Sequence, residues 1–318
     1  MGDAETEILA SDVAGIARAA SILRAGGRVS FPTETVFGLG ADATNDRAVA
    51  GIYEAKGRPS FNPLIVHLSD ETAAARFCRF NDTAKRLASA FWPGALTLVL
   101  PLRSDAGISK LVTAGLDSLA IRVPDHPIAQ KLLAAFNGPI AAPSANPSGR
   151  ISPTTAEHVL SGLKGRIEAV LDSGGCGVGL ESTIVECIGA PRLLRAGGLP
   201  VEAIEACLGF QLERGPKSDD AAPAAPGMLS SHYAPKGAVR LNATRAEPGE
   251  MLLGFGNIKG DLNLSESGDL TEAAARLFAC LHKFDALGAS KIAVAPIPEH
   301  GLGLAINDRL RRAAAPRN

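Results

Sequence analysis

The segment KGRPSFNPLIVH, residues 56–67, places two cations, an amide and an imidazole beside a glycine, two prolines and a short apolar run. Gly57 and Pro59 end a preceding helix and let the backbone approach a ligand closely. Arg58 offers a planar fork suited to a phosphate, and Lys56 offers a mobile point charge. The apolar run PLIV is typical of a buried strand. The segment therefore predicts a helix, an anion-binding loop and a strand; the alternative is a solvated basic turn.

Two other loops next to expected strands are rich in polar residues. FPTETVFGLG, residues 31–40, follows an expected helix over 12–25 and a short strand over 28–31. Hydroxyls and glycines at the end of a strand are typical of the sheet edge where an α/β protein holds a small polar ligand. The alternative is that the threonines cap the next helix. APSANPSGRIS, residues 142–152, follows a strand expected over 140–142, and is either a ligand loop stiffened by proline or a surface linker.

A single arginine, Arg122, lies in the apolar strand expected over 119–123. Because desolvating an unpaired cation is expensive, Arg122 must meet either a protein carboxylate or the carboxylate of a ligand. A glycine cluster over 174–179 matches neither a dinucleotide fingerprint nor a P-loop. Further helices are expected over 43–55, about 70–90, 129–135 and 201–208.

The composition is that of a globular enzyme. The 318 residues exceed the roughly 250 that one core usually holds, so two domains are expected. A formal net charge of -1 provides no global field to attract nucleic acid. The N-terminus is acidic and no apolar run approaches the roughly 20 residues that span a bilayer, so we expect a cytoplasmic protein without membrane contact. Five scattered cysteines without a CxxC pair predict free thiols.

Residues 211–236 divide the chain, because they are rich in proline, alanine and charge and lack periodicity. They nevertheless contain SSHYAP, and Tyr233 is unusual in an inert tether because the chain has only two tyrosines. Residues 237–318 alternate expected strands with helices over 270–287 and 305–315. The expected organisation is therefore an α/β catalytic domain over 1–210, a linker over 211–236 that acts as a lid, and a small α/β domain over 237–318.

Taken together, FPTETVFGLG, KGRPSFNPLIVH, AIRVP, APSANPSG, LESTIV, LRAG and PGMLSSHYAP closely resemble the Sua5/YrdC/YciO family of L-threonylcarbamoyladenylate synthases in its long, Sua5-type form. The resemblance implies a twisted open mixed sheet with helices around a concave cleft, followed by a Rossmann-like α/β domain. It implies that L-threonine, bicarbonate and ATP, with Mg2+, give threonylcarbamoyl-AMP and pyrophosphate, the first step of t6A37 modification in tRNA. The product would pass to the t6A transferase machinery, with weak or no direct tRNA binding.

The resemblance also assigns site residues. Lys56 and Arg58 would be catalytic by holding the triphosphate, and Arg122 would pair with the carboxylate of the amino acid. The implied ATP contacts are Lys56, Arg58, Asn62, Ser118, Ser144, Asn146, Ser152, Arg195 and Tyr233. The implied L-threonine pocket is Thr35, His67, Arg122, Ala142 and Ser182. Metal ligands stay unassigned. Phe37 stands where the family usually has tyrosine, so we expect it to pack.

The sequence contains no serine elbow and no cysteine beside a recognisable histidine partner, so the substrates would supply the reacting groups. One alternative is a carbamoyl transferase that forms carbamoyl adenylate. Such chains are much longer and carry an acylphosphatase region and zinc-finger cysteines, which this chain lacks. Another alternative is a double-stranded RNA-binding module, which the balanced charge disfavours.

Overall fold

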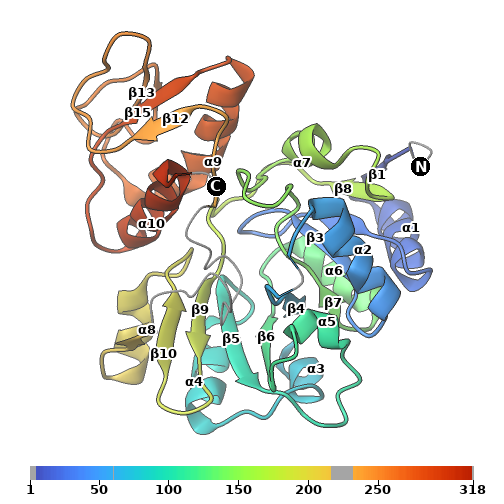
Figure 1. Cartoon of the computed structure of the whole chain (residues 1–318). Helices are drawn as coiled ribbons and strands as arrows, with labels where there is room; N and C mark the ends of the chain where they lie inside the picture. The colour runs from blue at the N-terminus through green and yellow to red at the C-terminus, as the bar shows by residue number, and fades with distance from the viewer. Residues whose placement is uncertain (1–4, 60, 216–231, 317–318) are drawn as a thin grey trace.

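The computed structural model of the chain describes residues 5–59, 61–215 and 232–316. Figure 1 shows a larger N-terminal unit and a smaller C-terminal unit. The larger unit contains one mixed sheet, whose strands are β1 Glu7–Ala10, β2 Val29–Phe31, β3 Gly38–Asp42, β4 Ile65–His67, β5 Leu96–Pro101, β6 Ser118–Arg122, β7 Ile140–Ala141, β8 Ala169–Asp172, β9 Thr183–Glu186, β10 Arg192–Arg195 and β11 Glu213–Arg214. Their order across the sheet is β1-β8-β2-β3-β7-β4-β6-β5-β9-β10-β11.

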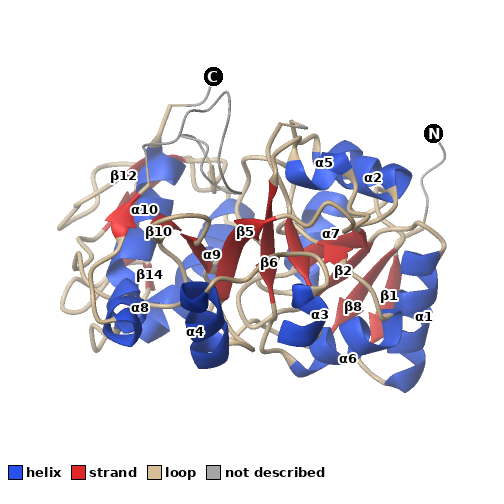
Figure 2. Cartoon of the chain, turned by 90° about the horizontal axis from the view of Figure 1, so that it is seen from below, coloured by secondary structure: helices blue, strands red, loops and turns tan. Residues whose placement is uncertain are grey.

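Helices lie on both sides of this sheet, with α2 Asp46–Lys56 and α5 Lys110–Thr113 on one side and α1 Val13–Arg24 and α6 Pro127–Phe136 on the other (Figure 2). The remaining helices of the unit are α3 Glu71–Ala75, α4 Asp82–Phe91, α7 Ala156–Leu163 and α8 Val201–Leu208. The apolar face of α1 packs with α6 and with β2 and β8 in one buried cluster. The helices thus leave the ends of the strands as the exposed parts of the sheet, and the loops there carry the polar motifs.

The strand register collects the polar motifs at one edge of the large sheet. β4 and β6 are parallel with His67 opposite Arg122, and β5 is antiparallel to β6 with Thr97 opposite Arg122. β5 also pairs in parallel with β9, which places Thr97 opposite Ile184. The carboxyl ends of β4 and β6 therefore lie beside the beginnings of β5 and β9. Ser182, immediately before β9, belongs to the same edge.

Most expected elements agree with the structure to within three residues, including α1, α2, α6 and α8. The single helix expected over about 70–90 is wrong. Asn81 accepts a hydrogen bond from the Ala84 amide and starts a second helix, α4, so the segment contains two helices. The capping alternative for FPTET is also wrong, because Thr33 accepts a hydrogen bond from Val36 and the next element is strand β3.

The smaller unit is a four-stranded parallel sheet in the order β12-β15-β13-β14. Its elements are β12 Ala238–Arg240, β13 Met251–Gly254, β14 Leu262–Asn263, α9 Leu270–Ala286, β15 Lys291–Val294 and α10 Leu302–Ala314. A large mixed sheet followed by a small α/β unit with a parallel sheet is the fold class expected from the sequence, which is confirmed.

The two units share an apolar core. Val36, Leu180 and Tyr233 belong to the same buried cluster as residues of α9 and α10. The rings of His158 and His282 stack across the boundary with centroids 3.9 Å apart. Strand β11 pairs with β10, so the large sheet includes residues at the beginning of the expected linker. Residues 216–231 of that linker lie outside the described residues.

All five cysteines are free thiols. No helix within the described ranges is long and apolar enough to cross a membrane.

Candidate active site

A small cavity of about 50 Å³ lies at the edge of the sheet where the polar motifs meet. Of the site residues expected from the sequence, the cavity is lined by Thr35, Arg58, His67, Arg122, Ala142, Ser144, Ser182, Arg195 and Tyr233. The other expected residues, which do not line it, are Lys56, Asn62, Ser118, Asn146 and Ser152. Seven separate segments of the chain, with residues 56–67 counted as one, thus contribute to one enclosed space.

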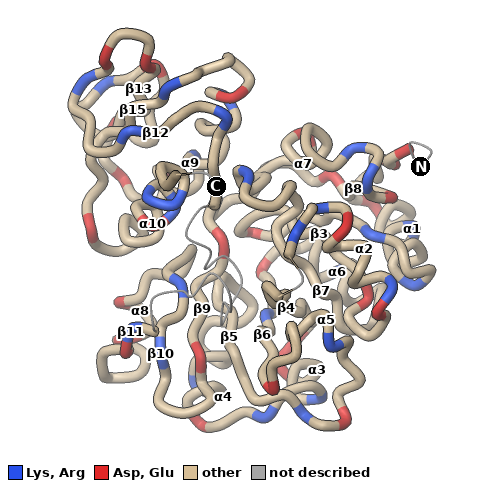
Figure 3. The backbone as a smooth tube through the Cα atoms, viewed as in Figure 1, with Lys and Arg blue, Asp and Glu red and all other residues tan. Residues whose placement is uncertain are grey.

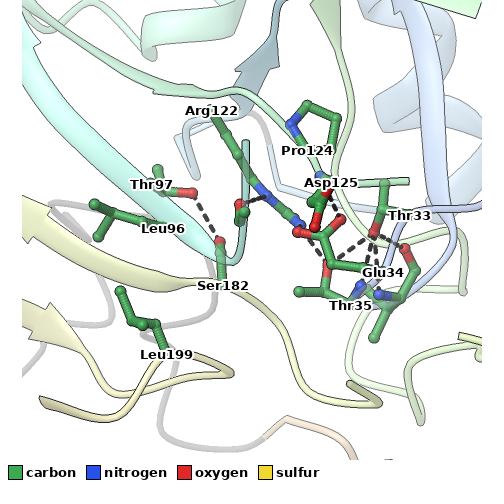
Figure 4. A network of polar contacts seen from close by, with 12 residues as sticks. Thr33, Glu34, Thr35, Leu96, Thr97, Arg122, Pro124, Asp125, Ser182 and Leu199 are labelled. Carbon is green, nitrogen blue, oxygen red and sulfur yellow. Dashed lines mark hydrogen bonds and ion pairs between the residues drawn. The ribbon is translucent and has the colours of Figure 1, made fainter. Parts of the chain in front are cut away.

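Arg122, at the end of β6, is almost fully buried and is bonded on three sides (Figure 4). Its Nε donates to the Gly94 carbonyl at 3.1 Å, Nη1 to the Thr35 hydroxyl at 2.8 Å, and Nη2 to Glu34 Oε1 at 2.5 Å. The second carboxylate oxygen of Glu34 accepts from the Asp125 amide. The partner that the sequence left open is therefore a protein carboxylate, while the guanidinium still lines the cavity.

Hydroxyl and imidazole groups surround Arg122. The Ser182 and Thr97 hydroxyls lie 2.7 Å apart (Figure 4). Burial, reinforced by the charge of Arg122, lowers the pKa of His67 to about 3, so the imidazole is neutral at physiological pH. The ring of Phe31 meets the His67 ring edge-on at 6.0 Å, which orients the imidazole. One wall of the cavity therefore combines a guanidinium with neutral hydrogen-bonding groups.

Two arginines supply positive charge to another part of the wall. Arg58 donates from Nη2 to the Pro63 carbonyl at 3.1 Å, and Arg195 donates from Nη2 to the Ser182 carbonyl at 2.8 Å. Burial lowers the pKa of Arg58 to about 10, so Arg58 remains a cation at neutral pH. Both guanidinium groups are thus fixed by backbone carbonyls and carry charge toward the cavity.

Lys56 has a different position from the one that the motif suggested. Its ammonium donates to the backbone carbonyls of Ser144 and Asn146. Burial and the neighbouring charge of Arg58 lower the pKa of Lys56 well below its usual value. In this structure Lys56 holds the proline-rich loop in place, and Arg58 is the member of the KGR motif that faces the cavity.

The expected residues outside the cavity wall differ in their surroundings. The amide of Asn146 donates to the carbonyls of Pro147 and Arg150, which stiffens the loop. The Ser152 hydroxyl donates to Glu181. Ser118 begins β6, so it lies at the opposite end of that strand from Arg122, and it is half-buried.

Several of these residues bury polar atoms that lack a hydrogen-bond partner among the described residues. The unpaired atoms in expected site residues are both amide atoms of Asn62, Nδ1 of His67, Oδ1 of Asn146 and the hydroxyl of Tyr233. Oγ of Ser30 and Nη2 of Arg309 are also buried without a partner among the described residues. A buried polar group without a partner costs about 1–3 kcal/mol. Four of these six residues are site residues expected from the sequence, so we interpret their unpaired atoms as groups that a ligand completes.

The sequence interpretation missed three residues in the site. Glu34 is the ionic partner of Arg122, and Glu181 and His232 line the cavity. Each of the three adjoins an expected site residue, Thr35, Ser182 or Tyr233, but nothing local shows which way its side chain points.

The two carboxylates of the site are already bonded to protein groups. Glu34 is bonded to Arg122 and to the Asp125 amide, and Glu181 is bonded to Ser152 and Arg309. Among residues 5–59, 61–215 and 232–316, no group of three or more His, Cys, Asp or Glu side chains could hold a metal ion.

Comparison with known proteins extends over nearly the whole chain. Residues 21–197 match the family model Sua5_yciO_yrdC, described as telomere recombination, and residues 199–315 match the C-terminal domain of threonylcarbamoyl-AMP synthase. The threonylcarbamoyl-AMP synthase of Bacillus subtilis (strain 168) is 43% identical, over 98% of this chain and 96% of that protein. The enzyme of the same name from Pyrococcus abyssi is 42% identical, over 94% of each chain. The crystal structure of P. abyssi Sua5 complexed with L-threonine superposes with a TM-score of 0.89 and 38% identity, over 97% of each chain.

Proposed function

The chain belongs to the Sua5/YciO/YrdC family, and from that premise we propose that it is an L-threonylcarbamoyladenylate synthase. It converts L-threonine, bicarbonate and ATP into threonylcarbamoyl-AMP and pyrophosphate, the first step of t6A modification of tRNA. One observation of the site carries this proposal: unpaired buried atoms of Asn62, His67, Asn146 and Tyr233 occur in the site whose cavity three arginines line. A ligand that is both anionic and rich in hydrogen-bonding groups would complete such a site.

Arg122 marks the threonine end of the site. A guanidinium held by Glu34 and Thr35 keeps a fixed orientation, and its two Nη atoms carry further N–H groups that suit a carboxylate. The Ser182 hydroxyl and the neutral imidazole of His67 are suited to the polar groups of an amino acid. We assign the amino acid to this end because its carboxylate needs one cation and its remaining polar atoms need neutral partners.

Arg58 and Arg195 mark the nucleotide end. The amine of threonine and bicarbonate form a carbamate with loss of water, and a carbamate oxygen then attacks the α-phosphorus of ATP. A new P–O bond forms as the bond to the β-phosphate breaks, so pyrophosphate leaves with the electron pair. The two arginines offset the charge that develops on the phosphates, and Lys56 keeps the Ser144–Asn146 loop in place for the nucleotide.

In this proposal Mg2+ binds together with ATP and has no separate site on the protein. Mg2+ is usually bound by one or two carboxylates together with phosphates and water. Because the oxygens of Glu34 and Glu181 are already bonded to protein groups, we propose that Mg2+ arrives on the phosphates of ATP.

The cavity must open before ATP can bind. Ligand pockets typically measure about 300–1,000 Å³, whereas this cavity measures about 50 Å³. His232 and Tyr233 form part of its wall and belong to the segment expected to act as a lid. We propose that these two residues move away for substrate entry and return to shield the carbamate from water.

The proposed partners follow from the reaction. The product would be passed to the enzymes that transfer the threonylcarbamoyl group to tRNA in the cytoplasm. Figure 3 shows Lys and Arg interspersed with Asp and Glu along both units. A mixed charge distribution of this kind supports weak or no direct tRNA binding.

Pyrophosphate release by the purified chain tests the proposal. We expect release from ATP to require L-threonine and bicarbonate together, and we expect threonylcarbamoyl-AMP in the same samples by mass spectrometry. A parallel sample without Mg2+ tests whether pyrophosphate release requires the metal. Release that needs carbamoyl phosphate instead, or no release in any mixture, would contradict the proposed function.

A further inference from the structure

One ion pair joins the smaller unit to the wall of the cavity. Arg309, on α10, is fully buried, and its Nε donates to Glu181 Oε2 at 2.9 Å. Its Nη1 donates to the Ala196 carbonyl at 2.7 Å and to Asp308 at 2.9 Å. Arg309 and Glu181 are separated by 128 positions in the chain, so the pair forms only when the two units are packed together.

The ion pair affects the site through the charge of Glu181. It lines the cavity with Arg58 and Arg195, the two cations assigned to the nucleotide phosphates. A buried carboxylate there would repel a triphosphate unless its charge were balanced. The guanidinium of Arg309 is the first of the charges that hold the pKa of Glu181 below its usual value despite burial, and Arg195 is the second.

Arg309 also contacts the tyrosine that forms part of the cavity wall. The guanidinium carbon lies 5.3 Å from the centre of the Tyr233 ring, and Phe278 of α9 stacks on the ring with centroids 5.6 Å apart. Tyr233 has φ = 63°, a left-handed conformation that is uncommon for a residue other than glycine. Contacts with the smaller unit therefore hold Tyr233 in a conformation that its own backbone does not favour.

Stability alone does not account for a buried arginine at this position. Replacing a buried ion pair by well-packed apolar residues is often neutral or stabilising, because desolvation offsets the attraction between the charges. Arg309 instead contacts two residues of the cavity wall, Glu181 and Tyr233, so its charge can act on the site.

We propose that Arg309 is a positioning residue through which the C-terminal unit completes the nucleotide site. It neutralises Glu181 and holds the Tyr233 ring, and ATP binding therefore depends on a residue outside the N-terminal unit. The inference rests on the proposed function for the identity of the ligand, but its test measures binding and needs no turnover.

The test compares binding constants of the full-length chain for ATP and for L-threonine by isothermal titration calorimetry. The variants are Arg309→Gln, Glu181→Gln and the double variant, and the matched control is Arg311→Gln. Arg311 lies on the same helix and pairs with Glu299, but both side chains are more than half exposed. The control should therefore bind ATP as the wild type does.

We expect Arg309→Gln to raise the Kd for ATP at least tenfold, since Glu181 is left without its partner. The Kd for L-threonine should stay within about threefold, because Arg122 and its partners are unchanged. Adding Glu181→Gln to Arg309→Gln should recover at least half of the lost ATP affinity on a logarithmic scale. A purely structural role would weaken both ligands together and would give no recovery.

Other outcomes would overturn either the positioning role of Arg309 or the proposed function. ATP affinity that is unchanged in Arg309→Gln, or a double variant as weak as Arg309→Gln, overturns the positioning role and leaves the proposed function intact. A wild-type chain that binds neither ATP nor L-threonine overturns the proposed function itself. If Arg309→Gln does not fold, Arg309→Met, which removes the charge but keeps a long unbranched side chain, replaces it with the same partner variant. Undiminished ATP affinity, or no recovery with Glu181→Gln, then contradicts the inference.

Discussion

Nη2 of Arg122 lies 2.5 Å from Oε1 of Glu34, and the two side chains are only 4% and 14% exposed. A buried ion pair at the wall of a cavity serves both the fold and the ligand. Within the fold, Arg122 balances the charge of Glu34. Toward the cavity, we propose that the same guanidinium binds the carboxylate of threonine. The two roles are separable, because only one of them requires Glu34 to be charged.

Arg122→Gln should therefore impair both folding and threonine binding. The change leaves a buried carboxylate without its cation, so the free energy of unfolding should fall by about 3 kcal/mol. The double variant Arg122→Gln/Glu34→Gln should recover most of that loss, whereas the KM for threonine should stay raised at least tenfold in both variants. Urea denaturation and pyrophosphate release measure the two effects. A double variant with normal threonine KM would contradict the assignment, and Arg103→Gln, which disrupts an exposed pair with Asp105, is the control.

Arg58→Gln should act on the chemical step. Losing a fixed cation at the developing charge typically costs about 3 kcal/mol of transition-state stabilisation, on the order of a hundredfold in rate. We expect kcat/KM for ATP to fall by that factor, while stability changes by about 1 kcal/mol because only hydrogen bonds to the Asn62 and Pro63 carbonyls are lost. Steady-state pyrophosphate release gives the answer, and an unchanged kcat/KM would exclude Arg58 from the nucleotide end.

The two tyrosines of the chain offer a matched pair of substitutions. The Tyr233 hydroxyl is buried without a hydrogen-bond partner among the described residues, whereas the Tyr53 hydroxyl donates to the carbonyls of Leu111 at 2.8 Å and Asn62 at 3.2 Å. Tyr233→Phe should stabilise the ligand-free chain by about 1 kcal/mol, and Tyr53→Phe should destabilise it by a similar amount.

With saturating ATP, the wild type should be more stable than Tyr233→Phe, which is the opposite of their order without ligand. If the hydroxyl contacts the nucleotide, the stabilisation that ATP provides should be smaller in Tyr233→Phe than in the wild type. Thermal unfolding with and without ATP measures both quantities. Equal stabilisation by ATP in the two proteins would remove the Tyr233 hydroxyl from the binding site.

His67 should make the chain sensitive to mild acid. Its pKa is about 3 when folded and about 6.5 when unfolded, so the unfolded chain binds more protons between these values and stability falls as the pH is lowered. Between pH 6.5 and pH 5 this contribution is about 2 kcal/mol. The fall in the free energy of unfolding over that range should be smaller by this amount in His67→Gln. His300→Gln, at an exposed position, is the control, and parallel curves for wild type and His67→Gln would contradict the prediction.

Local patterns predicted the elements well where one signal dominated. Helix α8 agrees residue for residue with its prediction, since its apolar spacing ends at Gly209, which has a left-handed conformation. Strand β6 was predicted to within one residue from its apolar run. The helix over 70–90 was wrong because the cap at Asn81 competes with an otherwise continuous periodicity.

The candidate site was less predictable because its partners are distant in the sequence. Arg122 and Glu34 are 88 positions apart, and Arg309 and Glu181 are 128 apart. The apolar strand around Arg122 indicated that this arginine needs an anionic partner, but only the folded sheet identifies Glu34 as that partner. The motif also placed Lys56 and Arg58 together, whereas the end of α2 directs Lys56 to a backbone loop and Arg58 to the cavity.

The order of strands in the large sheet has a consequence for how the chain is made. β1 pairs in parallel with β8, with Glu7 opposite Ala169, so β1 has no partner until the chain has been synthesised as far as β8. Pairing over such a distance closes a large loop and slows folding. During translation the exposed edge of β2, which also pairs with β8, stays open for the same interval. Open strand edges are templates for pairing with other chains, and β8 is the strand whose arrival covers the edges of both β1 and β2.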